Sequence, residues 1–349
     1  MDWQVQSVVI VTELAAGIVL FRFFIPFFRR VKTGKFDLYI GDRFKKDGSE
    51  PKFAGVVMAL TAVIGTAVGL LAKGFKGGLG TENKTDLSVY AACAAVMLVM
   101  CALGTAEDYH KETKRGTGLK KRWVLLTEFV VCLGFSYIVK ISGIADTKLL
   151  LPFRWGNIEL GFIFYPLTAA LMTVIINLAE LHDCPGGVTE YGCDGLCAVT
   201  TLVFSLAAAA GCAQYPWLEL AQMLSLVTAG ACAVYLIWGI SPSKIYLGRS
   251  GSRFLGAMTA MIVVTTDLPL AYLASGIVFI ADGVCTLVGH LVFRHKKQLL
   301  FKGLTLHGHL SKRGWSDYKI MGISALLTLL GGGAMFMYIN YSGSILLNK

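Results

Sequence analysis

Residues 53–72 read FAGVVMALTAVIGTAVGLLA, a stretch without a single charged side chain. A helix of about 20 residues spans the hydrocarbon core of a bilayer, and only helices or closed barrels satisfy their backbone groups there. The stretch therefore predicts a transmembrane helix. Similar apolar runs recur along the rest of the chain, at residues 6–27, 86–105, 123–139, 158–178, 195–213, 217–240, 254–265, 268–293 and 318–341.

The composition supports the same class. Of 349 residues, 55% are hydrophobic and 15% are charged, whereas soluble domains carry about 25% charged residues. We therefore expect an all-α integral membrane protein of about ten transmembrane helices, built as one polytopic membrane domain over residues 1–349. The short run at 254–265 is expected either to tilt or to continue into the next run across Asp267. The first run lacks the basic flank and cleavage site of a signal peptide and is expected to remain as a helix.

The loop charges predict the orientation. Of the lysines and arginines in loops, 24 lie in odd-numbered loops and 6 in even-numbered ones. Because cytoplasmic loops of membrane proteins carry an excess of lysine and arginine, the odd loops are expected in the cytoplasm and both termini outside. The net charge of +10 is then explained by loops beside anionic lipid, and no nucleic-acid partner is expected.

Nine cysteines occur, mostly inside the apolar runs and without the regular spacing of a disulfide framework, so we expect free thiols on small side chains that face lipid or other helices. A zinc site is a separate hypothesis for one short segment. It is disfavoured because the spacing there matches no C-x-x-C pair. The residues concerned are His182, Cys184, Cys193 and Cys197.

Most unusual polar residues fall in the odd loops, which indicates a site at one membrane surface. A transporter would more often place them at the midplane, where Glu13, Glu128 and Asp282 are the main candidates. In the third loop Glu107, Asp108 and Lys111 share one helical face. Two carboxylates and an ammonium group suit a divalent metal with a pyrophosphate. The alternative is a solvated helix end beside the membrane.

Five segments, in order, resemble the motifs of the phospho-N-acetylmuramoyl-pentapeptide transferase family, within the polyprenyl-phosphate N-acetylhexosamine-1-phosphate transferase superfamily. KKDGSEPKFAGVV at 45–57 looks like the Gly-Thr-Pro-Thr-Met-Gly-Gly segment, and EDYHK at 107–111 like Asp-Asp-x-x-Lys. DCPGGV at 183–188 with DGL at 194–196 is similar to Asn-x-Thr-Asp-Gly-x-Asp-Gly-Leu. YLGRSGS at 246–252 is similar to Gly-Asp-x-Gly-Ser, and LHGH at 306–309 to the triple-histidine loop.

The resemblance implies a phospho-sugar transferase of peptidoglycan precursor synthesis in the bacterial cytoplasmic membrane. Such enzymes move a phospho-N-acetylhexosamine from a UDP-sugar to undecaprenyl phosphate and require Mg2+; a homodimer is compatible with it. The resemblance implies catalytic roles for Asp108, Glu107, Asp194 and Lys111, and metal binding by Asp108 and Glu107. It implies substrate binding by Lys46, Asp183, Arg249, His307 and His309.

The departures from the motifs raise a second hypothesis. Arg249 stands where the family has a metal-ligating aspartate, and a guanidinium cannot ligate a cation. Gly186 and Gly308 stand where the family has an aspartate and a histidine. The alternative function is therefore a non-catalytic relative that binds polyprenyl phosphate or a nucleotide sugar, or regulates an active partner. In either case, we expect the acidic residues, Arg249 and the two histidines to converge in one cytoplasmic cleft.

Overall fold

The computed structural model describes residues 2–30, 51–75, 83–113, 119–145, 147–150, 157–183, 193–240, 243–296 and 305–347. Ten longer helices lie in these ranges, and each of the ten predicted apolar runs overlaps one of them, although the run at 158–178 begins before α5 and the run at 268–293 also contains α9. They are α1 (Trp3–Arg30), α2 (Ala54–Lys73), α3 (Asn83–Thr113), α4 (Lys121–Ile141), α5 (Phe164–Asp183), α6 (Leu196–Cys212), α7 (Glu219–Gly239), α8 (Gly248–Thr265), α10 (Ile277–Lys296) and α12 (Asp317–Leu347).

Short elements complete the described chain. Two of them are the helices α9 (Ala271–Ser275) and α11 (Leu306–Lys312), and two are the single turns η3 (Gly161–Ile163) and η4 (Pro216–Leu218). A hairpin of β1 (Lys148–Leu150) and β2 (Asn157–Glu159) pairs antiparallel, with Lys148 opposite Glu159.

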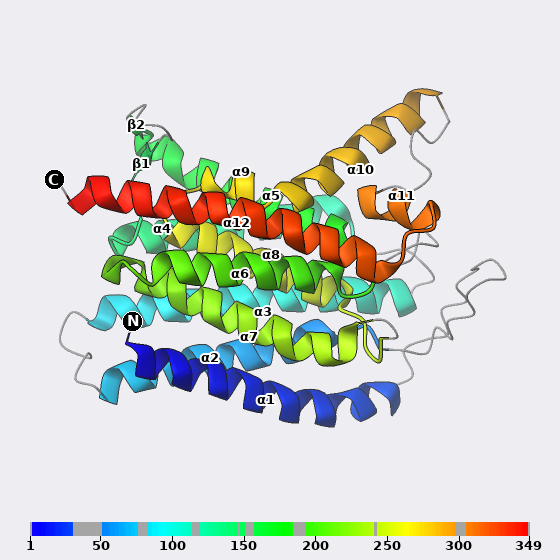
Figure 1. Cartoon of the computed structure of the whole chain (residues 1–349), viewed down its shortest axis with the longest axis horizontal. Coiled ribbons are helices and arrows are strands. Elements are labelled where there is room, and N and C mark those ends of the chain that lie inside the picture. The colour runs from blue at the N-terminus through cyan, green and yellow to red at the C-terminus, as the bar shows by residue number, and fades with distance from the viewer. Residues whose placement is uncertain are drawn as a thin grey trace.

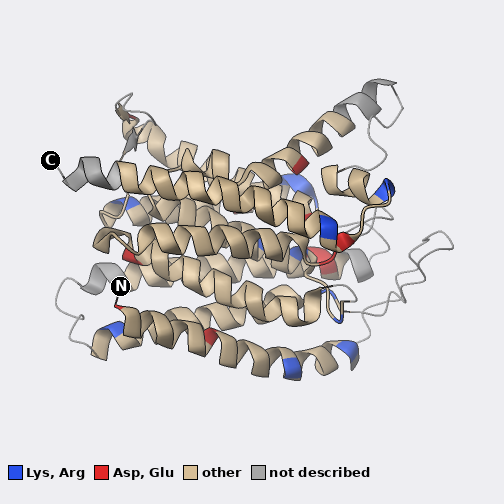
Figure 2. Ribbon diagram, viewed as in Figure 1, with Lys and Arg blue, Asp and Glu red and all other residues tan. Residues whose placement is uncertain are grey.

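Within the described ranges, seven helices are long and apolar enough to cross a membrane: α1, α2, α3, α4, α5, α7 and α12. Helices α6 and α8 lie among them, most of the helices run side by side, and α10 extends obliquely away from the bundle at its edge (Figure 1). The protein is thus an all-α, multi-pass membrane protein, as the sequence predicts. Both chain ends lie at one end of the bundle, and α11 lies at the other (Figure 1). The charged residues marked in Figure 2 are concentrated at the α11 end of the bundle.

Helix α8 is the centre of the bundle. It packs against α2, α3, α5 and α7, and every residue in it except Arg249 is buried. Because protein rather than lipid surrounds α8, its first turn can be polar and still helical. The helix therefore begins at Gly248 rather than at the predicted residue 254. It does not continue into the next run, because Asp267 has φ 55° and turns the chain.

Glycines let the neighbouring helices approach α8 closely. A Cβ atom at Gly104 of α3 would lie 2.3 Å from the carbonyl oxygen of Arg249, and one at Gly55 of α2 would lie 2.1 Å from the backbone nitrogen of Gly251. Close backbone approach through small residues is typical of helix packing in membranes. These two contacts fix the start of α8 against the ends of α2 and α3.

The predicted character of the cysteines is confirmed for those that the structure describes. All are free, and only Cys285 is not fully buried.

Candidate functional site

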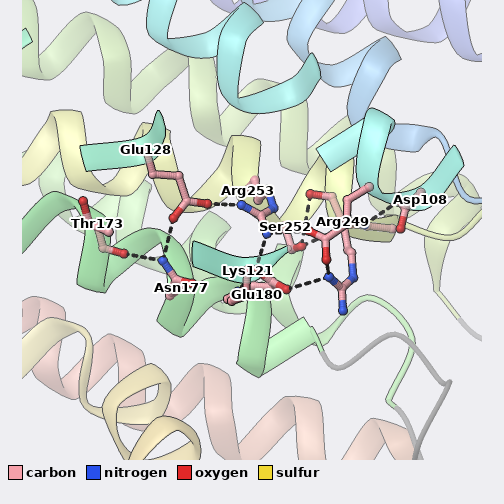
Figure 3. A network of polar contacts seen from close by, with 11 residues as sticks. Asp108, Lys121, Glu128, Thr173, Asn177, Glu180, Arg249, Ser252 and Arg253 are labelled. Atoms are coloured by element: carbon pink, nitrogen blue, oxygen red, sulfur yellow. Dashed lines mark hydrogen bonds and ion pairs between the residues drawn. The ribbon is translucent and has the colours of Figure 1, made fainter. Parts of the chain in front are cut away.

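An ionic network occupies the α11 end of the bundle, centred on Arg253 of α8. This side chain has no exposed surface. Its Nη2 donates to Glu107 Oε2 of α3 at 2.6 Å and to Glu180 Oε2 of α5 at 2.9 Å, and its Nη1 donates to Glu128 of α4. Figure 3 shows the guanidinium between these elements. One arginine thus connects three helices around α8.

Arg249 lies one helical turn before Arg253 and on the same face of α8. Its Nη1 pairs with Glu107 and lies 3.2 Å from Glu180 Oε1. Its backbone N–H donates to Asp108 Oδ2 at 2.8 Å. The Arg249 side chain is 20% exposed, whereas that of Arg253 is 0% exposed. Arg249 is therefore the member of the pair that solvent or a ligand can reach.

Two further contacts complete the network. Lys121 Nζ lies 3.1 Å from Glu180 Oε2, and the Asn177 side-chain amide donates to Glu128 Oε2 at 2.8 Å. The three glutamates are thus balanced by Arg249, Arg253 and Lys121. Such a balance is what a buried charged cluster requires, since an unpaired charge in a low-dielectric interior costs several kcal/mol.

Two aspartates of the predicted site lie beside this network. Asp194 Oδ2 accepts a hydrogen bond of 2.9 Å from the Ser243 hydroxyl. Asp183, the last residue of α5, lies near enough to Asp194, Asp108 and Glu180 for their charges to act on it. Predicted residues from four separate segments therefore meet at this end of the bundle.

A second polar cluster joins α5, α10 and α11. His182 Nδ1 lies 2.5 Å and His307 Nδ1 2.9 Å from the same atom, Asp282 Oδ2. The backbone N–H groups of Leu306 and His307 donate to the other oxygen of Asp282 at 2.9 and 3.3 Å. All three side chains are buried. His182 and Glu180 lie two residues apart on α5, which therefore contributes one side chain to each cluster.

Residues 90–267 match the family model of glycosyl transferase family 4. This chain belongs to that family. The matched region runs from α3 to the turn after α8 and so contains every residue of the ionic network.

Similar proteins include two phospho-N-acetylmuramoyl-pentapeptide-transferases. The one from Caldanaerobacter subterraneus subsp. tengcongensis is 25% identical over 340 residues, covering 93% of this chain and 96% of the relative. The one from Geobacillus thermodenitrificans is 25% identical over 340 residues, covering 95% of this chain and 98% of the relative. The resemblance inferred from five motifs is thus confirmed along nearly the whole chain.

The family is metal-dependent in general, but the described residues do not fit a magnesium ion. Both oxygens of Glu107 are paired with guanidinium groups, and Asp108 accepts from the Arg249 backbone. Among the residues that the structure describes, no three acidic side chains of the predicted site bring their oxygens within 4.8 Å of one another. Magnesium at such sites is held by one or two carboxylates together with substrate phosphates and water, at about 2.1 Å, and here both oxygens of the predicted ligand Glu107 are neutralised by guanidinium groups.

The predicted site residues thus divide between the two clusters. Glu107, Asp108 and Arg249 are in direct contact, whereas His307 contacts Asp282. His309 lies two residues after His307 on α11 and is half-buried. Lys111 belongs to α3, and Lys46 and Gly186 lie outside the described residues.

Sequence reasoning missed Glu180 and Arg253, and it considered His182 only with cysteines. A signal was present, because ionisable residues inside or next to apolar runs are rare and mark functional positions. Arg253 also follows Arg249 by four residues, which places both on one helical face. Cys193 and Cys197 instead contact backbone oxygens, of Asp317 and Ala179 respectively.

Proposed function

We propose that this chain binds undecaprenyl phosphate and a UDP-sugar of the phospho-N-acetylmuramoyl-pentapeptide type, without magnesium-dependent transfer between them. The proposal places the ligands at the α11 end of the bundle, facing the cytoplasm, with both termini outside. The observation that carries it is the pairing of Arg249 with Glu107 and Glu180. A permanent cation occupies the position where the family places a metal ligand.

Arg249 can still bind a phosphate group. Within the described part of the chain, its ion pairs use Nη1, and a guanidinium has five N–H donors in a planar fork that matches phosphate oxygens. Its partial exposure leaves this fork accessible. Asp108 accepts from the Arg249 backbone, and Asp183 lies near both Asp108 and Asp194. These three aspartates are the proposed contacts for the sugar-nucleotide hydroxyl groups. His309 and Lys111 are proposed to contact the anionic groups.

The transfer reaction joins two anions, because the lipid phosphate must attack the pyrophosphate of the UDP-sugar. A metal ion stabilises the charge that develops by several kcal/mol, and each 1.4 kcal/mol is about a tenfold change in rate. Loss of the metal ligand therefore predicts transfer at least about 10³-fold slower than in an active relative.

A second candidate function follows from the exposure of Arg249. Its guanidinium would stabilise the developing charge in place of a metal, so that slow transfer proceeds in EDTA. Transfer measured in EDTA separates the two candidate functions, because only the second predicts turnover that depends on Arg249.

Purified protein in lipid nanodiscs tests both functions. Binding of undecaprenyl phosphate and of UDP-N-acetylmuramoyl-pentapeptide is measured by native mass spectrometry, and transfer by a radiolabelled assay with magnesium or with EDTA. The transferase of Geobacillus thermodenitrificans is the positive control. We expect binding without magnesium-dependent transfer. Turnover in magnesium comparable with that of the control, or the absence of binding to either substrate, would contradict the proposal.

A further inference from the structure

The cluster of His182, Asp282 and His307 has the composition of a transition-metal site. Each residue offers one ligand atom, and these three atoms lie within 4.8 Å of one another. Two imidazole nitrogens and one carboxylate oxygen are ligands that zinc prefers. The three come from α5, α10 and α11, which are separate in the chain, and all three are buried.

The contacts around His182 call for a proton or a metal ion between its ring and Asp282. The Thr200 hydroxyl lies 3.0 Å from the carbonyl oxygens of both Leu196 and Cys197, and its one proton can be donated to either. With its proton placed there, Thr200 Oγ1 accepts from the Nε2–H tautomer of His182, 3.2 Å away. In a neutral imidazole the other nitrogen then carries a lone pair. That lone pair faces a carboxylate oxygen at 2.5 Å, and only a proton or a metal ion between them makes this contact favourable.

The surroundings match those of a metal ligand set. A metal-bound histidine usually donates its second ring N–H to a neighbouring oxygen. His182 Nε2 has Thr200 Oγ1 for this purpose, and His307 Nε2 has Thr305 Oγ1 at 3.2 Å. Asp282 is fixed by the two backbone N–H groups at the start of α11. Its second oxygen is therefore held toward both imidazoles.

We propose that His182 Nδ1, Asp282 Oδ2 and His307 Nδ1 bind one divalent ion of the zinc class. Metal–ligand bonds of about 2.1 Å place tetrahedral ligand atoms about 3.4 Å apart, so the rings move apart by less than about 1 Å to admit the ion. Binding releases the proton shared by His182 and Asp282, and the His307 ring proton moves from Nδ1 to Nε2. The ion fixes α11 to α5 and α10, and this role is independent of the proposed function.

The test uses full-length protein purified with a tag that contains no histidine, then loaded with Zn2+ and dialysed. Elemental analysis is expected to give about one zinc ion per chain. X-ray absorption at the zinc edge is expected to show nitrogen and oxygen ligands without sulfur. A sulfur shell would assign the metal to cysteines instead and would overturn the proposal, as would a wild-type protein that retains no zinc.

Variants locate the ion. His182→Ala, Asp282→Asn and His307→Ala are each expected to weaken zinc binding at least about tenfold, since each removes one ligand. His309→Ala is the matched control, because His309 lies on the same helix but outside the cluster, and it should retain the metal. Wild-type protein loaded with Co2+ gives a second readout, because the visible absorption of bound Co2+ reports tetrahedral coordination. This readout does not depend on the folding of any variant. Zinc retained by all three ligand variants would refute the assignment.

Discussion

Arg253 should be the side chain whose loss costs this protein most. The Arg253→Met variant replaces a charged side chain that has no exposed surface with an uncharged one of similar volume. Glu107 retains Arg249, and Glu180 retains Arg249 and Lys121. Glu128, which is fully buried, loses its cation and among the described residues keeps the Asn177 amide.

The magnitude follows from that one carboxylate. Removing one partner of a buried ion pair costs about 3–5 kcal/mol, because the other charge stays buried. Neutralising Glu128 in the same chain should therefore rescue stability. We expect Arg253→Met combined with Glu128→Gln to recover at least about 2 kcal/mol of the loss, within the range of coupling between contacting residues.

Equilibrium unfolding in SDS–detergent mixed micelles measures these changes in the free energy of unfolding. The buried cysteines provide a signal, since a thiol-reactive fluorescent dye labels them only on unfolding. Lys121→Met is the control, because this lysine is 51% exposed and surface ion pairs contribute at most about 1 kcal/mol. A loss below about 1 kcal/mol in Arg253→Met, or no rescue by Glu128→Gln, would refute the reasoning.

Three further predictions test packing, orientation and the metal ligand. Gly104→Ala should destabilise the fold by about 1–3 kcal/mol, because its Cβ would clash with α8, whereas Gly134→Ala, with nothing within 4 Å, should not; thermal unfolding compares them. Cysteines placed at Lys114 and Lys302 should resist impermeant thiol reagents in intact cells, and labelling of the Lys302 position from outside would reverse the topology. Arg249→Asp should bring measurable magnesium-dependent transfer in the radiolabelled assay, and Arg249→Ala should abolish any transfer in EDTA. An Arg249→Asp protein that folds but gains no transfer would mean that other departures also block the reaction.

The charged side chains that are buried at one end of this membrane protein are stabilised by one another. Each carboxylate of the network meets a guanidinium, an ammonium or an amide, and the three glutamates are balanced by three cations. An ion pair of this kind adds little net stability compared with apolar packing, whereas breaking it leaves a buried charge unpaired. The network links α3, α4 and α5 to α8 through two arginines.

The sequence by itself determined the membrane class and the positions of the ten long helices. Lipid excludes water from the backbone, so apolar runs such as 53–72 must be helical wherever they occur. Five short motifs also carried the family, because each of them can be recognised within one short segment of the chain. The start of α8 was missed because its first turn is polar, and hydropathy cannot tell a helix covered by protein from one covered by lipid.

Only the tertiary structure decided which charged side chains meet. Glu107 and Arg249 are 142 positions apart and His182 and Asp282 are 100 apart, and no local pattern links such pairs. Glu128 and Asp282 were visible as charges in apolar runs, but their partners depend on which helices pack together. The sequence therefore predicted Arg249 as the altered position, whereas its pairing with Glu107, the central role of Arg253 and the position of His307 beside His182 follow from the packing around α8.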